Sequence, residues 1–343
     1  MPVPTAKRRW SRELGSQVDG IAFGSEGPVL LHGYDPPAGG KWVDDVIPGK
    51  LGALDRNTGE LLWMAPCEVG YGRGFGAGVG VRGQVLVLGP TTSGHRMVRM
   101  AMADGELIDV SEIPAFDEAH VAKDLCLCSA AGRIFAIDST QMSEVWEYRR
   151  EGERFHHVSR AGDRALVAFS NRDSGKHGVA ILDAETGEFE GLLVEPTLPV
   201  IHGIAVTHET CLLLTCDIEP MLQTDQARSR FAIELASHED EGTTDTLTLV
   251  GLRVGGRLGD DPLWHRILET RPTGDLPEVS ISADSGKLYL ERGAHMSAVD
   301  ALTGRDLGEW TVPGLDEQIA WSVVQGAGLL AEETRVSLFE LPA

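Results

Sequence analysis

Three histidines stand at the beginnings of predicted β-strands and could together bind a transition metal. They are His120 in EAHVAK, His156 or His157 in FHHVSR, and His202 in IHGIAV. Imidazole nitrogens are common ligands of zinc, iron and copper, and three of them leave coordination positions open for substrate or water. The choice between His156 and His157 stays open, because a shift of one residue in strand register turns a side chain to the other face.

Two carboxylates also stand at the beginnings of predicted first strands, and they are candidate general bases. Asp19 lies in VDGIAF, and Glu278 lies in PEVSIS. Glu278 could also serve as a further metal ligand or as a partner that orients one. Counting back ten residues from the second strand of five predicted repeats reaches Asp19, Phe75, His156, His202 and Glu278. The third repeat has a shorter first turn, and there His120 takes the similar place.

An internal repeat positions these residues. Its copies are LGALDRNTGELLW, VAILDAETGEFEG and MSAVDALTGRDLGEW, and RIFAIDSTQMSEVW is a degenerate fourth. The Asp can accept hydrogen bonds from turn amides, and the Gly supplies a positive φ at a tight turn. The Trp begins the next strand and can cover the gap to a neighbouring sheet.

The repeat predicts a seven-bladed β-propeller of four-stranded antiparallel blades in a single domain, 1–343. Two strands precede each copy and one follows it, and the period of about 45 residues is that of a propeller blade. We expect the N-terminal strand KRRWSREL to complete the last blade, which removes the open sheet edges. The predicted blades are 18–66, 71–114, 117–150, 155–196, 199–269, 276–313, and 317–343 plus 7–14, with an insertion at 219–244 in the fifth.

The D-x-x-T-G-x-x-x-W pattern resembles the repeats of PQQ-like (quinoprotein-type) β-propellers, and the resemblance covers nearly the whole chain. Quinoprotein dehydrogenases of this type are longer and use an adjacent Cys-Cys pair at the cofactor. No Cys-Cys pair occurs here, so PQQ is not expected. The resemblance also extends to non-enzymatic scaffold proteins.

The amino-acid composition disfavours some classes of binding partner. The formal net charge of −22 disfavours nucleic acid and anionic membrane surfaces. Five cysteines without a tight framework favour reduced thiols, and with no apolar run of signal-peptide length we expect a cytoplasmic protein. Cys126 and Cys128 share one face of a strand, which is more typical of buried thiols than of a metal site.

The loops between second and third strands hold the insertions, which favours function on that face. One is residues 33–50, and the longest is 219–244, which we expect to add a short helix or hairpin. His95, His177 and His295 begin third strands on the same side.

The sequence therefore predicts a cytoplasmic metalloenzyme with metal ligands His120, His157 (or His156) and His202. Iron or copper would make it an oxidoreductase acting on a small organic molecule or peptide. Zinc would make it a lyase or hydrolase, with Glu278 or Asp19 as base. The competing interpretation is a non-catalytic scaffold for a protein partner, in which water bridges the histidines and Trp42 and Trp321 are candidate contacts.

Overall fold

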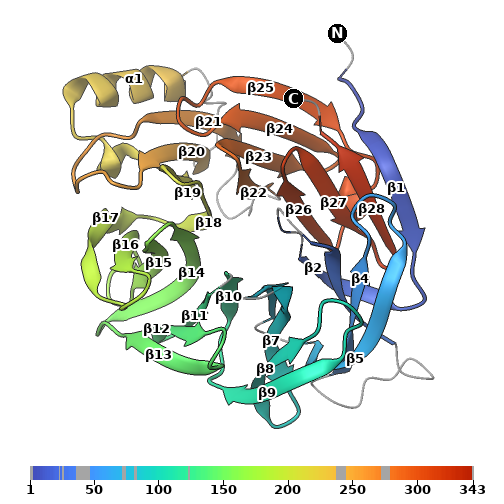
Figure 1. Cartoon of the computed structure of the whole chain (residues 1–343). Helices are drawn as coiled ribbons and strands as arrows, with labels where there is room; N and C mark the ends of the chain where they lie inside the picture. The colour runs from blue at the N-terminus through green and yellow to red at the C-terminus, as the bar shows by residue number, and fades with distance from the viewer. Residues whose placement is uncertain are drawn as a thin grey trace. The chain divides into compact units, whose positions relative to one another are not determined.

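The computed structural model describes residues 3–22, 24, 27–35, 47–71, 75–80, 83–122, 124–236, 245–271 and 279–341. The fold is a seven-bladed β-propeller in which each blade is a four-stranded antiparallel sheet, as predicted (Figure 1). The chain divides into two compact units, Met1–Tyr148 with Trp310–Ala343 and Arg149–Glu309. That 1–343 forms a single domain stays a prediction.

The first unit holds blades one, two, three and seven. Blade one is β2 (Gln17–Ala22), β3 (Val29–Tyr34), β4 (Ile47–Leu54) and β5 (Leu61–Tyr71); blade two is β6 (Gly76–Val79), β7 (Val85–Thr91), β8 (Gly94–Met100) and β9 (Leu107–Ile113). Blade three is β10 (Glu118–Val121), β11 (Leu125–Ala130), β12 (Arg133–Asp138) and β13 (Ser143–Tyr148); blade seven is β26 (Ala320–Val324), β27 (Ala327–Ala331), β28 (Arg335–Glu340) and β1 (Lys7–Glu13).

The second unit holds blades four and five and most of blade six. Blade four is β14 (Glu153–Ala161), β15 (Arg164–Asn171), β16 (His177–Asp183) and β17 (Phe189–Leu198). Blade five is β18 (Ile201–Val206), β19 (Thr210–Cys216), β20 (Asp245–Arg253) and β21 (Trp264–Arg271). Blade six is β22 (Val279–Asp284), β23 (Lys287–Arg292), β24 (His295–Asp300) and β25 (Asp306–Thr311), whose last two residues belong to the first unit.

The N-terminal strand completes blade seven, which confirms the prediction for KRRWSREL. β1 pairs antiparallel with β28, and Trp10 lies opposite Leu338. The outer strand of this blade thus comes from the beginning of the chain and the other three strands from its end.

The insertion in blade five contains the expected helix, α1 (Asp225–Ala236), after a short 3-10 turn, Glu219–Met221. Its remainder, 237–244, and most of the loop 33–50 with Trp42 lie outside the described residues. None of the helices found in the described residues has the length and apolar character of a membrane span.

The Asp of each repeat holds a tight turn between the third and fourth strands. Asp55 Oδ1 accepts the amides of Asn57 at 2.9 Å and Thr58 at 2.8 Å, and Gly59 follows with φ +72°. Hydrogen bonds from Thr58 and Asn57 lower the pKa of Asp55. In the degenerate copy Met142 replaces the Gly and still adopts a positive φ of 55°, so the turn geometry persists without glycine.

Tryptophans of the outer strands contact a turn of the adjacent blade at three junctions, each within one unit. Trp10 Nε1 donates to the carbonyl of Arg56 at 2.8 Å, and the Cβ of any residue replacing Gly59 would lie 2.6 Å from the Trp10 ring. The same contact recurs in both units: Trp63 donates to Met102 at 2.8 Å over Gly105, and Trp264 donates to Ala301 at 3.0 Å over Gly304. The role predicted for the Trp is thus confirmed at Trp10 and Trp63, and Trp264 makes the same contact, whereas Trp310 Nε1 is buried without a hydrogen-bond partner among the described residues.

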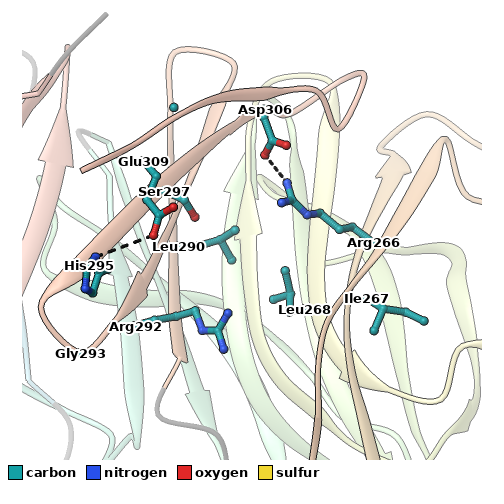
Figure 2. Close-up of a pocket in the computed structure, with 11 residues that line it drawn as sticks. Arg266, Ile267, Leu268, Leu290, Arg292, Gly293, His295, Ser297, Asp306 and Glu309 are labelled. Atoms are coloured by element: carbon teal, nitrogen blue, oxygen red, sulfur yellow. Dashed lines mark hydrogen bonds and ion pairs between the residues drawn. The ribbon is translucent and has the colours of Figure 1, made fainter. Parts of the chain in front are cut away.

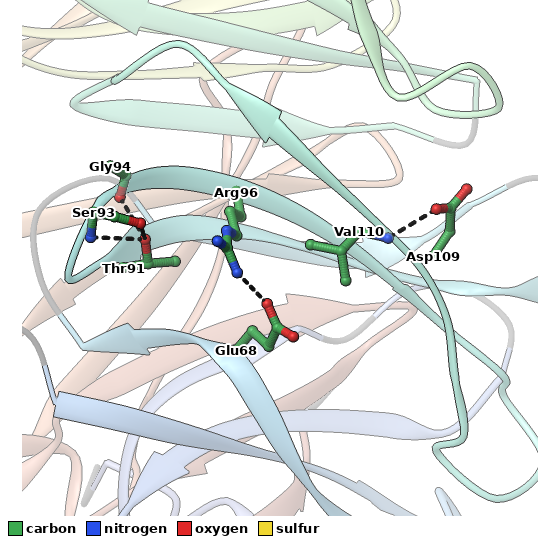
Figure 3. Close-up of polar contacts among 7 residues, drawn as sticks. All are labelled: Glu68, Thr91, Ser93, Gly94, Arg96, Asp109 and Val110. Atoms are coloured by element: carbon green, nitrogen blue, oxygen red, sulfur yellow. Dashed lines mark hydrogen bonds and ion pairs between the residues drawn. The ribbon is translucent and has the colours of Figure 1, made fainter.

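Polar side chains add further links between blades of the first unit. Arg96 of β8 forms an ion pair with Glu68 of β5 (Figure 3). Arg99 forms an ion pair with Asp109 at 2.9 Å and also donates to the carbonyl of Thr140 in blade three at 2.9 Å. Buried apolar side chains also pack between adjacent blades, as Leu54 and Val29 of blade one do with Leu338 of blade seven.

Replacing Gly59 with Ala is expected to lower the free energy of unfolding more than replacing Gly162 does. Both glycines have positive φ, +72° and +65°, so each variant should lose about 1–2 kcal/mol from the left-handed conformation. Only at Gly59 would the new Cβ displace a tryptophan, which should add about 1–3 kcal/mol. Urea unfolding of the two variants measures this difference, and equal losses would show that the Trp10 contact does not hold the blades together.

Candidate functional site

A β-bulge in the first strand of three blades takes one side chain out of the pairing register. The bulged residues are Asp19 in β2, His156 in β14 and His202 in β18. A bulge leaves its extra residue unpaired and re-aims its side chain, and bulges are common beside functional sites. The three predicted site residues therefore occupy equivalent places in blades one, four and five.

Each bulged side chain contacts a side chain of the second strand in its own blade. His156 Nε2 lies 2.8 Å from Ser170 Oγ, and His202 Nε2 lies 3.4 Å from Cys216 Sγ. Both partners follow their histidine by 14 residues. Blade one has the same arrangement with the residue types exchanged, because the carboxylate of Asp19 contacts a histidine of β3.

That histidine, His32, is buried at 1% exposure and was not predicted as a site residue. Its Nδ1 lies 2.6 Å from Asp19 Oδ1, and its Nε2 lies 3.2 Å from the carbonyl of Val69. The ring is thus held between the carboxylate of Asp19 on one side and the backbone of β5 on the other. Gly49 must lack a side chain, because a Cβ there would collide with the imidazole and with Val69.

A histidine cluster forms in the second unit. The rings of His156 and His177 stack with centroids 5.2 Å apart and planes 17° apart. Burial, together with His156, His202 and His157, lowers the pKa of His177 to about 4. Burial likewise lowers the pKa of His156, with a contribution from His157. At neutral pH His156 and His177 are therefore uncharged, the form in which imidazole binds metals.

His120 does not share the bulged position. It pairs with Leu127 in a regular ladder, in the place that Ser159 has opposite Leu166, and Glu118 takes the place of His157. The sequence alignment of His120 with His156 and His202 is therefore wrong, because the ladder places His120 nearer the turn between the first two strands and because β10 lacks the bulge. Between the two candidates in blade four, His156 is the equivalent of His202.

The predicted metal set stays a prediction. Within the ranges that the structure describes, no three His, Cys, Asp or Glu side chains are arranged to hold a metal ion. His120 lies in the first unit, whereas His156, His157 and His202 lie in the second. Glu278 lies outside the described residues, and Asp19 is engaged with His32.

Cys216 is a site residue that the sequence analysis missed. Its spacing from His202 equals that of Ser170 from His156, and this spacing was the available signal. Cys216 is partly exposed, whereas the other four cysteines are buried. Burial raises the pKa of Cys67 to about 11 and that of Cys126 to about 12. The pair Cys126 and Cys128 is part of the core, as expected for buried thiols.

A separate cavity of about 650 Å³ lies between the outer parts of blades five and six (Figure 2). Leu268 and Leu290 contribute apolar surface. Arg266 is paired with Asp306, and His295 Nδ1 lies 3.8 Å from Glu309. None of the predicted metal ligands or general bases lines this cavity, although His295 does, and the ion pair of Arg266 with Asp306 joins blades five and six.

Comparison with known proteins supports the repeat family over part of the chain. The family model described as outer membrane protein assembly factor BamB matches residues 48–191. This match confirms the resemblance to PQQ-like propeller repeats. A search of curated protein sequences finds no match.

Solved structures show the propeller fold. Hydrazine synthase of Kuenenia stuttgartiensis is 11% identical, with 96% of each chain covered and a TM-score of 0.59. The WD40 propeller domain of Doa1 is 9% identical, covers 97% of this chain and 96% of its own, and has a TM-score of 0.56. BamB from Moraxella catarrhalis is 15% identical, with 98% and 100% covered and a TM-score of 0.49.

The stability of the second unit is expected to fall between pH 6.5 and pH 4 because His177 is kept neutral. An unfolded imidazole takes up a proton near pH 6.5, whereas folded His177 does so only near pH 4. Acidification in this window therefore favours the unfolded chain. In urea unfolding at pH 7, 5.5 and 4.5, His177→Gln should lose less stability than the wild type. The control is His208→Gln, at an exposed turn residue, and an unchanged profile for His177→Gln would contradict the assignment.

Proposed function

We propose that the chain is a non-catalytic propeller that binds a protein partner. The observation that carries this proposal is the way the bulged side chains are used. Asp19, His156 and His202 each contact a side chain of their own blade, which is the arrangement of a structural lining. The family model that matches residues 48–191 describes an assembly factor, a class of protein that acts through partners.

The outer strands of blades one to three offer a surface for such a partner. Their exposed apolar residues are Leu61 and Leu62 in β5, Leu107 and Ile108 in β9, and Val145 in β13. As outer strands they also present one unpaired backbone edge, to which an extended segment can add. Apolar side chains exposed on successive outer strands are typical of an interaction surface.

The charges beside these residues indicate the chemistry of the partner. Glu60 precedes Leu61, and Glu106 precedes Leu107, and both carboxylates are exposed. No ion pair to either glutamate is found among the described residues. We therefore propose a partner segment that carries apolar and basic side chains, which the net charge of −22 would also attract.

We also propose a reducing, cytoplasmic location. The structure describes all five cysteines, and none is joined in a disulfide. Thiols that persist unpaired are typical of reducing compartments.

The double variant Leu62→Ser/Ile108→Ser is expected to lose the partner. These side chains are 53% and 45% exposed, so the substitutions should change stability little while removing apolar contacts. Affinity capture of the full chain from its own cells, followed by binding measurements on the purified partner, gives the dissociation constant, which should rise at least about tenfold. Leu302→Ser, at a residue 43% exposed in a turn of blade six, is the control. A stoichiometric partner that binds wild type and double variant equally would contradict the proposed surface, and the lack of any stoichiometric partner would contradict the function.

A second candidate is a metal-dependent enzyme, an oxidoreductase with iron or copper acting on a small organic or peptide substrate. The specific observation in its favour is the cluster of uncharged imidazoles around His177. Its ligands would be His120, His157 (or His156) and His202, with Asp19 or Glu278 as base. A lyase or hydrolase with zinc would use the same ligands.

Metal analysis tests this second candidate. Protein purified without chelator should contain about one equivalent of iron, copper or zinc, because three imidazoles bind such ions tightly. The variant His120→Ala/His202→Ala should contain none. Wild-type protein that holds no metal even after metal addition would exclude the enzyme that we describe.

A further inference from the structure

The contact between Cys216 and His202 has the geometry of two ligands on one metal ion. Sγ and Nε2 lie 3.4 Å apart. Zinc binds thiolate at about 2.3 Å and imidazole at about 2.0 Å in a tetrahedral arrangement, which places the two ligand atoms about 3.5 Å apart. The two side chains thus already stand at the separation that a shared metal requires.

We propose that Cys216 and His202 form a binding site for a thiophilic d10 metal ion, Zn²⁺ or Cu⁺. Thiolate together with imidazole selects these ions over Mg²⁺, Ca²⁺ and Mn²⁺, which prefer oxygen ligands. The inference is independent of protein binding and of catalysis, since two protein ligands hold an ion without supplying a reaction. Water would complete the coordination.

The surroundings of the pair favour a cation. Cys216 is the partly exposed member of the five cysteines, so an ion can reach its sulfur. The ring of His177 stacks on that of His156 in blade four. Its Nδ1 is buried and has no hydrogen-bond partner among the described residues. Binding releases the thiol proton to solvent and leaves the thiolate on the metal.

Blade four shows why the site belongs to blade five. There the equivalent pair is His156 with Ser170, whose hydroxyl is a poor ligand for these ions. The chain therefore already contains the arrangement that Cys216→Ser would create, 2.8 Å between imidazole nitrogen and hydroxyl. This variant should fold normally and lose only the sulfur.

The experiment titrates the full-length reduced chain with Zn²⁺ against a chromophoric chelator, and separately with Cu⁺ under anaerobic conditions. We expect one equivalent of one of these ions to bind, and the arm with the tighter dissociation constant identifies it. Cys216→Ser and His202→Gln should each weaken binding by about 100-fold. Co²⁺ added in place of zinc should give a thiolate-to-cobalt charge-transfer band that Cys216→Ser abolishes.

His120→Ala is the matched control, because His120 is predicted as a ligand only for the three-histidine site. It should bind the ion as the wild type does. Binding that depends on His120 and is unchanged in Cys216→Ser would overturn this inference and support the three-histidine site. The lack of binding of either ion would also overturn it and would leave the proposed protein partner untouched. Far-ultraviolet circular dichroism of each variant separates loss of the site from loss of the fold.

Discussion

The indole of an outer-strand tryptophan donates its N–H to the turn of the next blade and lies over the glycine of that turn. A single four-stranded sheet cannot bury both of its faces by itself, so each blade depends on its neighbours for a core. The indole N–H can donate to the turn carbonyl only if the turn is held in place. Asp55 holds the turn by accepting hydrogen bonds from its amides. The glycine is required twice, because its φ is positive and because a Cβ would enter the ring of Trp10. One contact thus explains the Asp, the Gly and the Trp of the repeat together.

The blade count and the role of the N-terminal strand could be predicted because this contact leaves a mark in the sequence. Asp55, Gly59 and Trp63 follow one another at intervals of four residues. The distance along the sequence between copies of this motif predicts the length of one blade. The bulges leave no such mark, since an extra residue in a strand changes neither composition nor alternation enough to be seen. The sequence also aligned His120 with His202, whereas the ladder of blade three sets His120 opposite Leu127, nearer the first turn, and the bulged place in blade four belongs to His156. Side-chain partners such as Cys216 depend on that register and were missed with it.

The same bulges decide how the histidines are interpreted. A bulged side chain that pointed away from its blade could serve as a metal ligand. In blade one the bulged Asp19 contacts a ring nitrogen of His32, and in blade four the bulged His156 contacts the hydroxyl of Ser170. Both are ordinary hydrogen-bonding distances between second-strand and first-strand side chains. In blade five the partner is sulfur, the one contact of the three that a metal ion would strengthen. The same bulged contact thus has different chemistry in different blades, and it is separate from the exposed apolar residues of the outer strands β5, β9 and β13.

Hydrogen–deuterium exchange of the chain with and without its purified partner tests the central claim most directly, because it locates the bound surface without any substitution. The outer strands β5 and β9 present backbone amides along one edge, and a bound segment would slow their exchange. The account predicts that protection on binding is concentrated in Leu61–Tyr71 and Leu107–Ile113. Protection concentrated instead in the first strands, at His156 and His202, would contradict it.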